Sequence, residues 1–470
     1  MFILLLFALF FFKLKKKQPN GRLFMFISMK IKNFRSIIET MVSMTYEEGK
    51  APNGYKDLPR WAFLEDKAER LVPCLAIYGA NAGGKSNIIK AFLAFDHLLK
   101  FGTGDAFEPF LKNGAVPVFD PNLLISDNET TYFESKIVLN GSIFTYGVEY
   151  SEKKIVHEFL NEGRDDDNRP IFEIKDSELI HFSKVSSATY KEKDLKEFLR
   201  VECSDKDGLQ NRTFLYLMGT KYPALNKNIA DVLEFFLKSV FISLNNQIPA
   251  GLGMKMLEDA LKNQGQMETA FDKLQKITTK LDFGIERLEI DRTKLEQDAA
   301  GEYQLQINPL EGGPIGGRRE GPEAFAEYLY SYHKNDEQKE VRFNFNRESM
   351  GTQIAFGVLG SILAALEKGG LVLIDELDRS LHSLVFQQIV QMFTNKRYNT
   401  QNAQLIFTAH NTDLLDADIL RISEIDFVNK TKKKGTTIQR LVEFSDVRNV
   451  TNFRKRYLSG EFDGIPFPYL

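Results

Sequence analysis

The stretch Gly79-Ala80-Asn81-Ala82-Gly83-Gly84-Lys85-Ser86 satisfies the pattern G-x-x-x-x-G-K-[ST] and decides the fold. An apolar segment, residues 74–78, runs into this stretch and predicts a short buried strand. Residues 86–99 leave it with apolar side chains at helical spacing and predict a helix. A glycine-rich loop between a strand and a helix N-terminus presents backbone N–H groups to phosphate. This context predicts a P-loop nucleotide-binding site in an α/β domain.

The residue types within the loop indicate what it binds. We expect residues 79–86 and the following Asn87 to contact a nucleotide. The Lys85 ammonium is expected to reach the β- and γ-phosphates, and the Ser86 hydroxyl to bind Mg²⁺. ATP and Mg²⁺ are therefore the expected ligands, and Lys85 is also expected to neutralise charge during hydrolysis.

Two later apolar segments end in side chains suited to hydrolysis. Residues 371–374 predict a buried parallel strand that ends at Asp375 and Glu376. We expect Asp375 to hold Mg²⁺ through water and Glu376 to polarise the attacking water as general base. A second segment, residues 405–409, ends at His410, one helix and one strand later. This order favours a γ-phosphate sensor at His410, although a lone histidine is usually a satisfied surface or core residue.

The rest of the chain divides by its pattern. Asn140-Gly141 joins two β-rich runs and predicts a hairpin within an antiparallel meander. From about residue 190 to 295 the apolar spacing becomes helical, in short stripes that cannot sustain a coiled coil. We therefore predict an α/β P-loop ATPase head over residues 25–185 and 339–470, with an antiparallel β subdomain in the first part. Residues 186–338 are expected to form a mostly helical insertion.

The first residues differ from the others. Residues 2–12 are an apolar run followed by lysines, and the run is shorter than the ~20 residues of a membrane span. A secretory signal would carry its positive charges before the run. We interpret residues 1–24 as a leader outside the fold, with a weak membrane tether as the alternative. No stable membrane insertion is expected.

The composition limits which cellular compartment and which kinds of binding partner we expect for this protein. The 470 residues include 61 Lys and Arg against 64 Asp and Glu, so nucleic acid could bind only at a local basic patch. Arg318-Arg319 and the lysines around Lys433 are the candidates, and solvated loops are the simpler explanation of both. Two cysteines, Cys74 and Cys203, exclude a disulfide scaffold and suit a reducing cytoplasm.

Further motifs carry a family resemblance. They are Glu348-Ser349-Met350-Gly351-Thr352-Gln353, the block that runs from Asp375 to His382, Thr408-Ala409-His410-Asn411-Thr412, Asn33-Phe34-Arg35-Ser36, and Arg456-Tyr457-Leu458-Ser459-Gly460-Glu461-Phe462. With the P-loop, these motifs resemble an ABC-class ATPase head. They are most similar to the stand-alone ATPases of the OLD/abortive-infection (AbiL-like, RloA-like) group.

The resemblance implies roles for several residues. Ser349 and Gly351 would cap the γ-phosphate bound by another subunit, so that two heads form a homodimer around ATP–Mg²⁺. Arg35 would lie near the nucleotide phosphates. Asp378 would lie at the subunit interface, although helix capping and packing explain Asp378 and His382 equally well.

The resemblance also implies an ATP hydrolase whose closed dimer controls a separate effector, such as a nuclease, in antiphage defence. No TOPRIM-like carboxylate cluster follows His410, which favours an effector on another protein. The alternative is a RecF/SMC-like ATPase that acts directly on DNA in repair or maintenance. A hexameric AAA+ motor is disfavoured by the segment Ser349–Gln353 and by the lack of a clear arginine finger after the acidic strand.

Overall fold

The computed structural model describes residues 24–46, 70–103, 116–125, 129–183, 211–243, 248–261, 269–281, 284–297, 303–304, 313–320, 323–379, 381–395, 397–416, 419–431, 433–447, 452–462 and 464. Residues 1–23 of the predicted leader and Cys203 lie outside them, whereas Phe24, the last residue of that leader, is the first residue of a strand and corrects the expected boundary by one residue. The chain divides into two compact units. Unit 1 comprises Met1–Leu244, Gly369–Asp375 and Ile389–Leu470, and unit 2 comprises Asn245–Lys368 and Glu376–Gln388.

Unit 1 is built on a 13-stranded mixed sheet. At one end of this sheet the strands are parallel, in the order β20 (Ile425–Thr431), β5 (Cys74–Gly79), β19 (Gln404–Thr408), β18 (Leu371–Ile374) and β11 (Val240–Ser243). Every residue of β5, β18 and β19 is buried, as the apolar segments predict. Parallel strands end at a common edge, so the loops that follow β5, β18 and β19 meet there.

The remaining strands of this sheet are antiparallel. They are β21 (Gly435–Arg440), β2 (Ile37–Ser43), β1 (Phe24–Phe34), β6 (Thr131–Leu139), β7 (Ser142–Tyr150), β8 (Ile155–Glu162), β9 (Arg169–Lys175) and β10 (Glu178–Phe182). The predicted hairpin between β6 and β7 is confirmed: Asn140 and Gly141 have φ of 52° and 90°. Positive φ at both central residues is what a type I′ turn requires.

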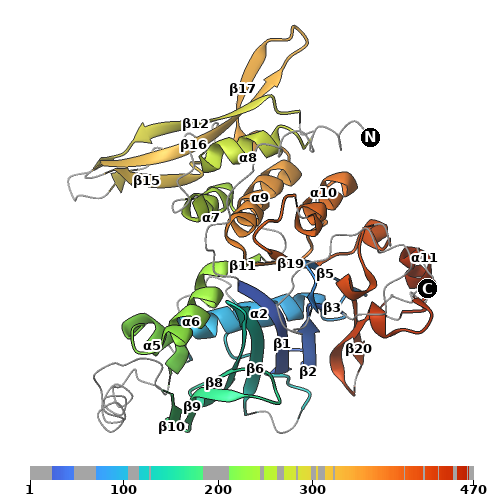
Figure 1. The fold of residues 1–470 in the computed structure, drawn as a ribbon. Helices are drawn as coiled ribbons and strands as arrows, with labels where there is room; N and C mark the ends of the chain where they lie inside the picture. The colour runs from blue at the N-terminus through green and yellow to red at the C-terminus, as the bar shows by residue number, and fades with distance from the viewer. Residues whose placement is uncertain are drawn as a thin grey trace. The chain divides into compact units, whose positions relative to one another are not determined.

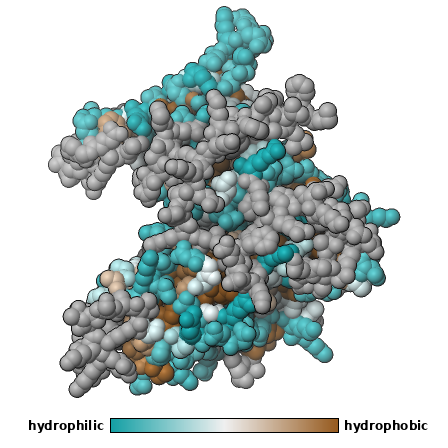
Figure 2. Space-filling model, viewed as in Figure 1, coloured by the Kyte–Doolittle hydropathy of each residue, from teal (hydrophilic) through white to brown (hydrophobic). Residues whose placement is uncertain are grey.

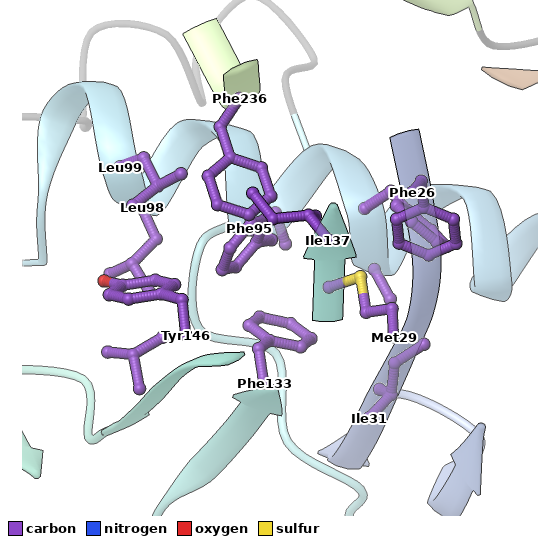
Figure 3. Close-up of a cluster of buried hydrophobic side chains, with 14 of the residues drawn as sticks. Phe26, Met29, Ile31, Phe95, Leu98, Leu99, Phe133, Ile137, Tyr146 and Phe236 are labelled. Carbon is purple, nitrogen blue, oxygen red and sulfur yellow. The ribbon is translucent and has the colours of Figure 1, made fainter. Parts of the chain in front are cut away.

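Helix α2 (Lys85–Phe101) leaves the P-loop and packs on the sheet (Figure 1). Its Phe95 ring lies edge-on to Phe133 at 5.7 Å and to Phe236 at 5.1 Å. Phe236 belongs to α6 (Lys227–Ser239), which follows α5 (Phe214–Lys221). Figure 3 shows Phe95, Phe133 and Phe236 meeting in one cluster, so the abundant phenylalanines build the core of unit 1.

Unit 2 contains helices and a four-stranded antiparallel sheet. The helices are α7 (Ala250–Leu261), α8 (Ala270–Thr278) and α9 (Met350–Lys368), and α10 (Ser383–Thr394) begins in this unit. The sheet comprises β12 (Arg287–Lys294), β15 (Gly316–Glu320), β16 (Glu323–Lys334) and β17 (Glu340–Asn344). Hydrophilic side chains cover the β16–β17 hairpin (Figure 2).

Helices α7 and α9 approach each other closely through glycine. A Cβ on Gly360 would lie 2.2 Å from the backbone of Gly253. Among the described helices, α9 alone is long and apolar enough to span a membrane, but 78% of its apolar window is buried inside the protein, as in a core helix.

The expected mostly helical insertion over 186–338 needs a correction. Its described residues contain α5, α6, α7 and α8, and they also contain β11, β12, β15 and β16. In β16 the alternation of Ala324 and Ala326 with half-buried or exposed neighbours indicates a strand, which the helical stripes nearby obscured. Two minor pairs of short strands complete the described elements: β3 (Thr45–Tyr46) with β4 (Arg70–Leu71), and β13 (Glu296–Gln297) with β14 (Tyr303–Gln304).

Candidate functional site

The P-loop has a backbone that glycine makes possible. Gly84 has a φ of 109°, and a Cβ there would lie 2.2 Å from Oγ1 of Thr436. A Cβ on Gly79 would lie 2.5 Å from the carbonyl oxygen of Val428. Because these two glycines have no side chain, β20 and β21 can pack directly against the loop. Ala82, with a φ of 61°, takes up a left-handed conformation in the same loop.

Lys85 is the first residue of α2 and is 5% exposed. Its ammonium donates hydrogen bonds to the carbonyl oxygens of Gly79 at 2.7 Å and Ala80 at 3.1 Å. The cation is therefore held inside the curve of the loop, at the N-terminus of a 17-residue helix. Loop N–H groups, helix N-terminus and ammonium together provide the positive charge that a triphosphate requires.

The predicted metal ligands meet directly. Ser86 donates from Oγ to Oδ1 of Asp375 at 3.2 Å, and Thr408 donates from Oγ1 to the same oxygen at 2.6 Å. Asp375 is 1% exposed. A hydroxyl and a carboxylate are the hard oxygen donors that Mg²⁺ prefers, and Mg²⁺ commonly completes its shell with water and substrate phosphates. The pair of Ser86 and Asp375 fits such an ion. Elsewhere, the described residues contain no cluster of three or more His, Cys, Asp or Glu that could hold a metal.

A hydrogen-bonded chain supports the loop from the far ends of the sequence. Asn87 donates from Nδ2 to Oγ of Ser36 at 2.6 Å, and Ser36 shares a hydrogen bond with Oγ1 of Thr436 at 2.7 Å. Thr436 in turn donates to the carbonyl oxygen of Gly83 at 3.3 Å. Sequence reasoning missed the part played by Ser36 and Thr436. The N-F-R-S motif marks Ser36, whereas no pattern marks Thr436.

Arg35 lies in the turn between β1 and β2, next to Ser36. Its φ is 51° and its N–H donates to the carbonyl oxygen of Asp120 at 2.7 Å. Its Nε lies 3.4 Å from Oδ2 of Asp120, and both side chains are about one-third exposed. The contact of Arg35 with a nucleotide stays a prediction.

His410 lies two residues after the end of β19, at the same sheet edge as the P-loop, and its side chain is exposed. Cys74, at the start of β5, is fully buried. Burial raises the pKa of its thiol well above the ordinary value, so this cysteine stays protonated and chemically inert.

The acidic pair divides between the two units, because Asp375 closes a segment of unit 1 and Glu376 opens one of unit 2. Glu376 has a φ of 53°, an unusual backbone for a residue with a side chain. Its carboxylate lies 3.3 Å from the guanidinium of Arg379 and is 28% exposed. Left-handed backbone at such residues is concentrated at functional sites.

In unit 2, Ser349 caps α9. Its Oγ accepts the N–H of Thr352 at 3.1 Å, and Gln353 donates from Nε2 to the carbonyl oxygen of Glu348 at 2.8 Å. The Glu348 carboxylate accepts a hydrogen bond from Ser331 and is paired with His333 at 2.6 Å. Hydrogen bonds therefore fix Ser349 and the first turn of α9, which contains Gly351, to the segment that precedes the helix. The contact of this segment with a phosphate in another subunit stays a prediction.

Comparisons with known proteins identify a family for this chain and a few similar solved structures. A family model described as "AAA domain, putative AbiEii toxin, Type IV TA system" matches residues 74–200 and 238–416. No curated protein matches significantly. Among solved structures, the SMC head domain from Thermotoga maritima is similar at 12% identity and a TM-score of 0.34, over 88% of this chain and 98% of that one. The recombination mediator RecF with ATP is similar at 13% identity and a TM-score of 0.33, over 90% of this chain and 98% of that one.

Proposed function

The chain belongs to this AAA-domain family of P-loop ATPases, and we propose that it hydrolyses ATP as an ABC-type dimer that controls a separate effector. The effector would be a protein such as a nuclease, and the setting would be antiphage defence. The family description, which names a toxin of a toxin–antitoxin system, supports this setting.

One observation carries the ATPase proposal: the Ser86 hydroxyl and the Asp375 carboxylate lie 3.2 Å apart beside the P-loop. Ser86 lies in the first turn of α2, the helix that follows β5, and Asp375 follows β18, so the sheet joins two motifs 289 residues apart. Bound Mg²⁺ would supply neutralisation of phosphate charge. Lys85 would orient the β- and γ-phosphates from within the loop.

The remaining roles follow from chemistry and family resemblance. Glu376 would accept a proton from the attacking water, and His410 would contact the γ-phosphate. Ser349 and Gly351 would complete the site of a second subunit from the N-terminus of α9, where backbone N–H groups favour an anion. Arg35 would contact the phosphates from the β1–β2 turn.

The ATPase proposal is tested with Lys85→Ala and Glu376→Gln in the full chain. Lys85→Ala should abolish nucleotide binding, because it removes the ammonium that would donate hydrogen bonds to both the β- and γ-phosphates. Charge-assisted hydrogen bonds contribute roughly 1.5–3 kcal/mol each. Glu376→Gln should retain binding while ATP turnover falls by about 10²- to 10⁴-fold. Fluorescent-nucleotide binding and phosphate release measure the two quantities. Lys90→Ala, on the same helix, is the matched control and should resemble the wild type.

If Glu376→Gln hydrolyses ATP at the wild-type rate, Glu376 is not the general base. A steep salt-dependent affinity of the wild-type protein for duplex DNA would instead favour the RecF/SMC-like alternative.

The defence role is tested by plaque assays in cells that carry the gene with its neighbours. Wild type should reduce plaque numbers and Lys85→Ala should lose that protection, since ATP binding is proposed to drive it. Full protection by Lys85→Ala would contradict the proposal.

A further inference from the structure

The C-terminal motif Arg456–Phe462 has no part in the function proposed above. In unit 1 it spans the end of α11 (Phe453–Leu458) and the turn that follows (Figure 1). The Tyr457 ring stacks on Phe427 at 5.1 Å and lies 6.1 Å from the Tyr78 ring. The Tyr457 hydroxyl donates to the carbonyl oxygen of Gly464 at 3.2 Å, and a Cβ on Gly464 would lie 3.4 Å from Cα of Gly79. The motif therefore packs where β5 becomes the P-loop.

Tyr78, the residue before the P-loop, also contacts the loop that carries His410. Its hydroxyl donates to the carbonyl oxygen of Asn411 at 3.1 Å. On the other side of the histidine, the N–H of Ala409 donates to the carbonyl oxygen of Ile77 at 3.2 Å. His410 thus lies between two residues that are hydrogen-bonded to consecutive residues of β5.

Helix α11 holds the far side of the same loop. The N–H of Arg454 donates to the carbonyl oxygen of Leu415 at 2.9 Å, and its guanidinium lies 3.0 Å from Oδ1 of Asp413. The N–H of Asp413 donates to Oδ1 of Asn411 at 2.8 Å. The loop is therefore bounded by β5 at its start and by α11 at its end.

We propose that Tyr78 is a positioning residue for His410, and that α11 supports it in this role. The Tyr78 side chain is 1% exposed, so its ring and hydroxyl have little freedom to move. Because Tyr78 leads directly into Gly79, the P-loop and the loop that carries His410 are both attached to the end of β5. The distance between the bound phosphates and His410, which would contact the γ-phosphate, is then held constant. This inference rests on the proposed ATPase function.

The first test is the substitution Tyr78→Phe in the full chain, which removes only the hydroxyl. We expect kcat for ATP to fall by about 10-fold and KM to stay within about 2-fold, because misplacement of about 1 Å can reduce rates by about 100-fold. Tyr150→Phe is the matched control: Tyr150 is also buried and its hydroxyl also donates to a backbone carbonyl, that of Val118 at 2.7 Å. Equal losses in the two variants would overturn the proposal.

A double-mutant cycle with His410→Ala tests whether Tyr78 acts through the histidine. If it does, Tyr78→Phe should reduce kcat in the wild type but not in the His410→Ala background. Fully additive losses would overturn the positioning role.

Hydrogen exchange without nucleotide gives a readout that does not depend on turnover. The amides of residues 411–415 should exchange at least about 10-fold faster in Tyr78→Phe, and at the wild-type rate in Tyr150→Phe. Unchanged exchange in Tyr78→Phe would overturn the inference. A wild-type protein without ATP turnover would instead contradict the proposed function, and the exchange result would still decide the role of Tyr78.

Discussion

Single residues in the P-loop are constrained by neighbours that lie far away in the sequence. Gly84 combines a left-handed φ with a Cβ position that Thr436 already occupies. Gly141 also has a left-handed φ, but a Cβ there would meet no atom within 4 Å. Substitution of Gly141 therefore tests backbone strain alone, whereas substitution of Gly84 tests backbone strain together with steric contact.

We predict that Gly84→Ala weakens ATP binding by more than about 10-fold. Either Thr436 or the loop must move to make room for the Cβ, and the backbone N–H groups of the loop then no longer point toward the phosphates. Gly141→Ala should bind ATP normally and lose only about 1–2 kcal/mol of stability, the cost of left-handed backbone with a Cβ. Nucleotide titration and urea unfolding measure these outcomes. Normal ATP affinity in Gly84→Ala would show that the contact with Thr436 does not shape the loop.

At the scale of elements, a buried carboxylate attaches α5 to the sheet of unit 1. Glu158 on β8 accepts the N–H groups of Phe214 at 2.7 Å and Leu215 at 2.8 Å, at the N-terminus of α5. It also accepts the hydroxyl of Tyr146 at 3.0 Å. Burial raises the pKa of Glu158 to about 7, although these hydrogen bonds act to lower it. The desolvation cost therefore exceeds the benefit of the hydrogen bonds.

This pKa predicts how stability changes with pH. Between the ordinary value of 4.5 and about 7, the folded state binds the Glu158 proton more tightly than the unfolded state does. The contribution of Glu158 is therefore fully present below about pH 4.5 and is lost as pH rises toward 7, by at most about 1.4 kcal/mol per pH unit.

Glu158→Gln should remove this contribution, so the difference in unfolding free energy between wild type and variant should change between pH 5 and pH 7. Urea unfolding at each pH measures it. Tyr150→Phe is the control, because burial raises the pKa of Tyr150 well above its ordinary value and its loss of stability should be the same at both pH values. A difference for Glu158→Gln that stays constant with pH would contradict the assignment.

At the scale of the whole molecule, the functional motifs belong to two units. Lys85, Asp375 and His410 lie in unit 1, and Glu376 and Ser349 lie in unit 2. In the proposed dimer, the segment that begins α9 would serve the nucleotide of another subunit. ATP binding should then join two chains, and hydrolysis should release them.

We predict that the solution mass of Glu376→Gln doubles when Mg-ATP is added, since bound ATP persists in this variant. The double variant Lys85→Ala/Glu376→Gln should keep the mass of a single chain, because it cannot bind ATP. Light scattering after size exclusion measures both. A six-fold ring would favour the AAA+ reading, and a Glu376→Gln mass that ignores ATP would contradict the proposed dimer.

Sequence alone was sufficient where structure is local. The strand, loop and helix around Lys85, the Asn140-Gly141 hairpin and the apolar strands β18 and β19 follow from periodicity and turn chemistry within short windows. Strand β16 was missed because its alternation follows a region of helical stripes. The placement of Phe236 in the core of unit 1 depends on packing and not on local pattern.

The sequence by itself determined which motifs this protein carries: a P-loop, an acidic pair at the end of a strand, and a histidine after another strand, each contained in a short contiguous segment. Only the tertiary structure decided which distant residues complete them. Ser36 meets Thr436 across 400 positions, and Tyr78 meets Asn411 across 333, because strand order brings these segments together. The physical reason is that a motif is defined by local backbone geometry, whereas its support depends on a sheet topology that no short window contains.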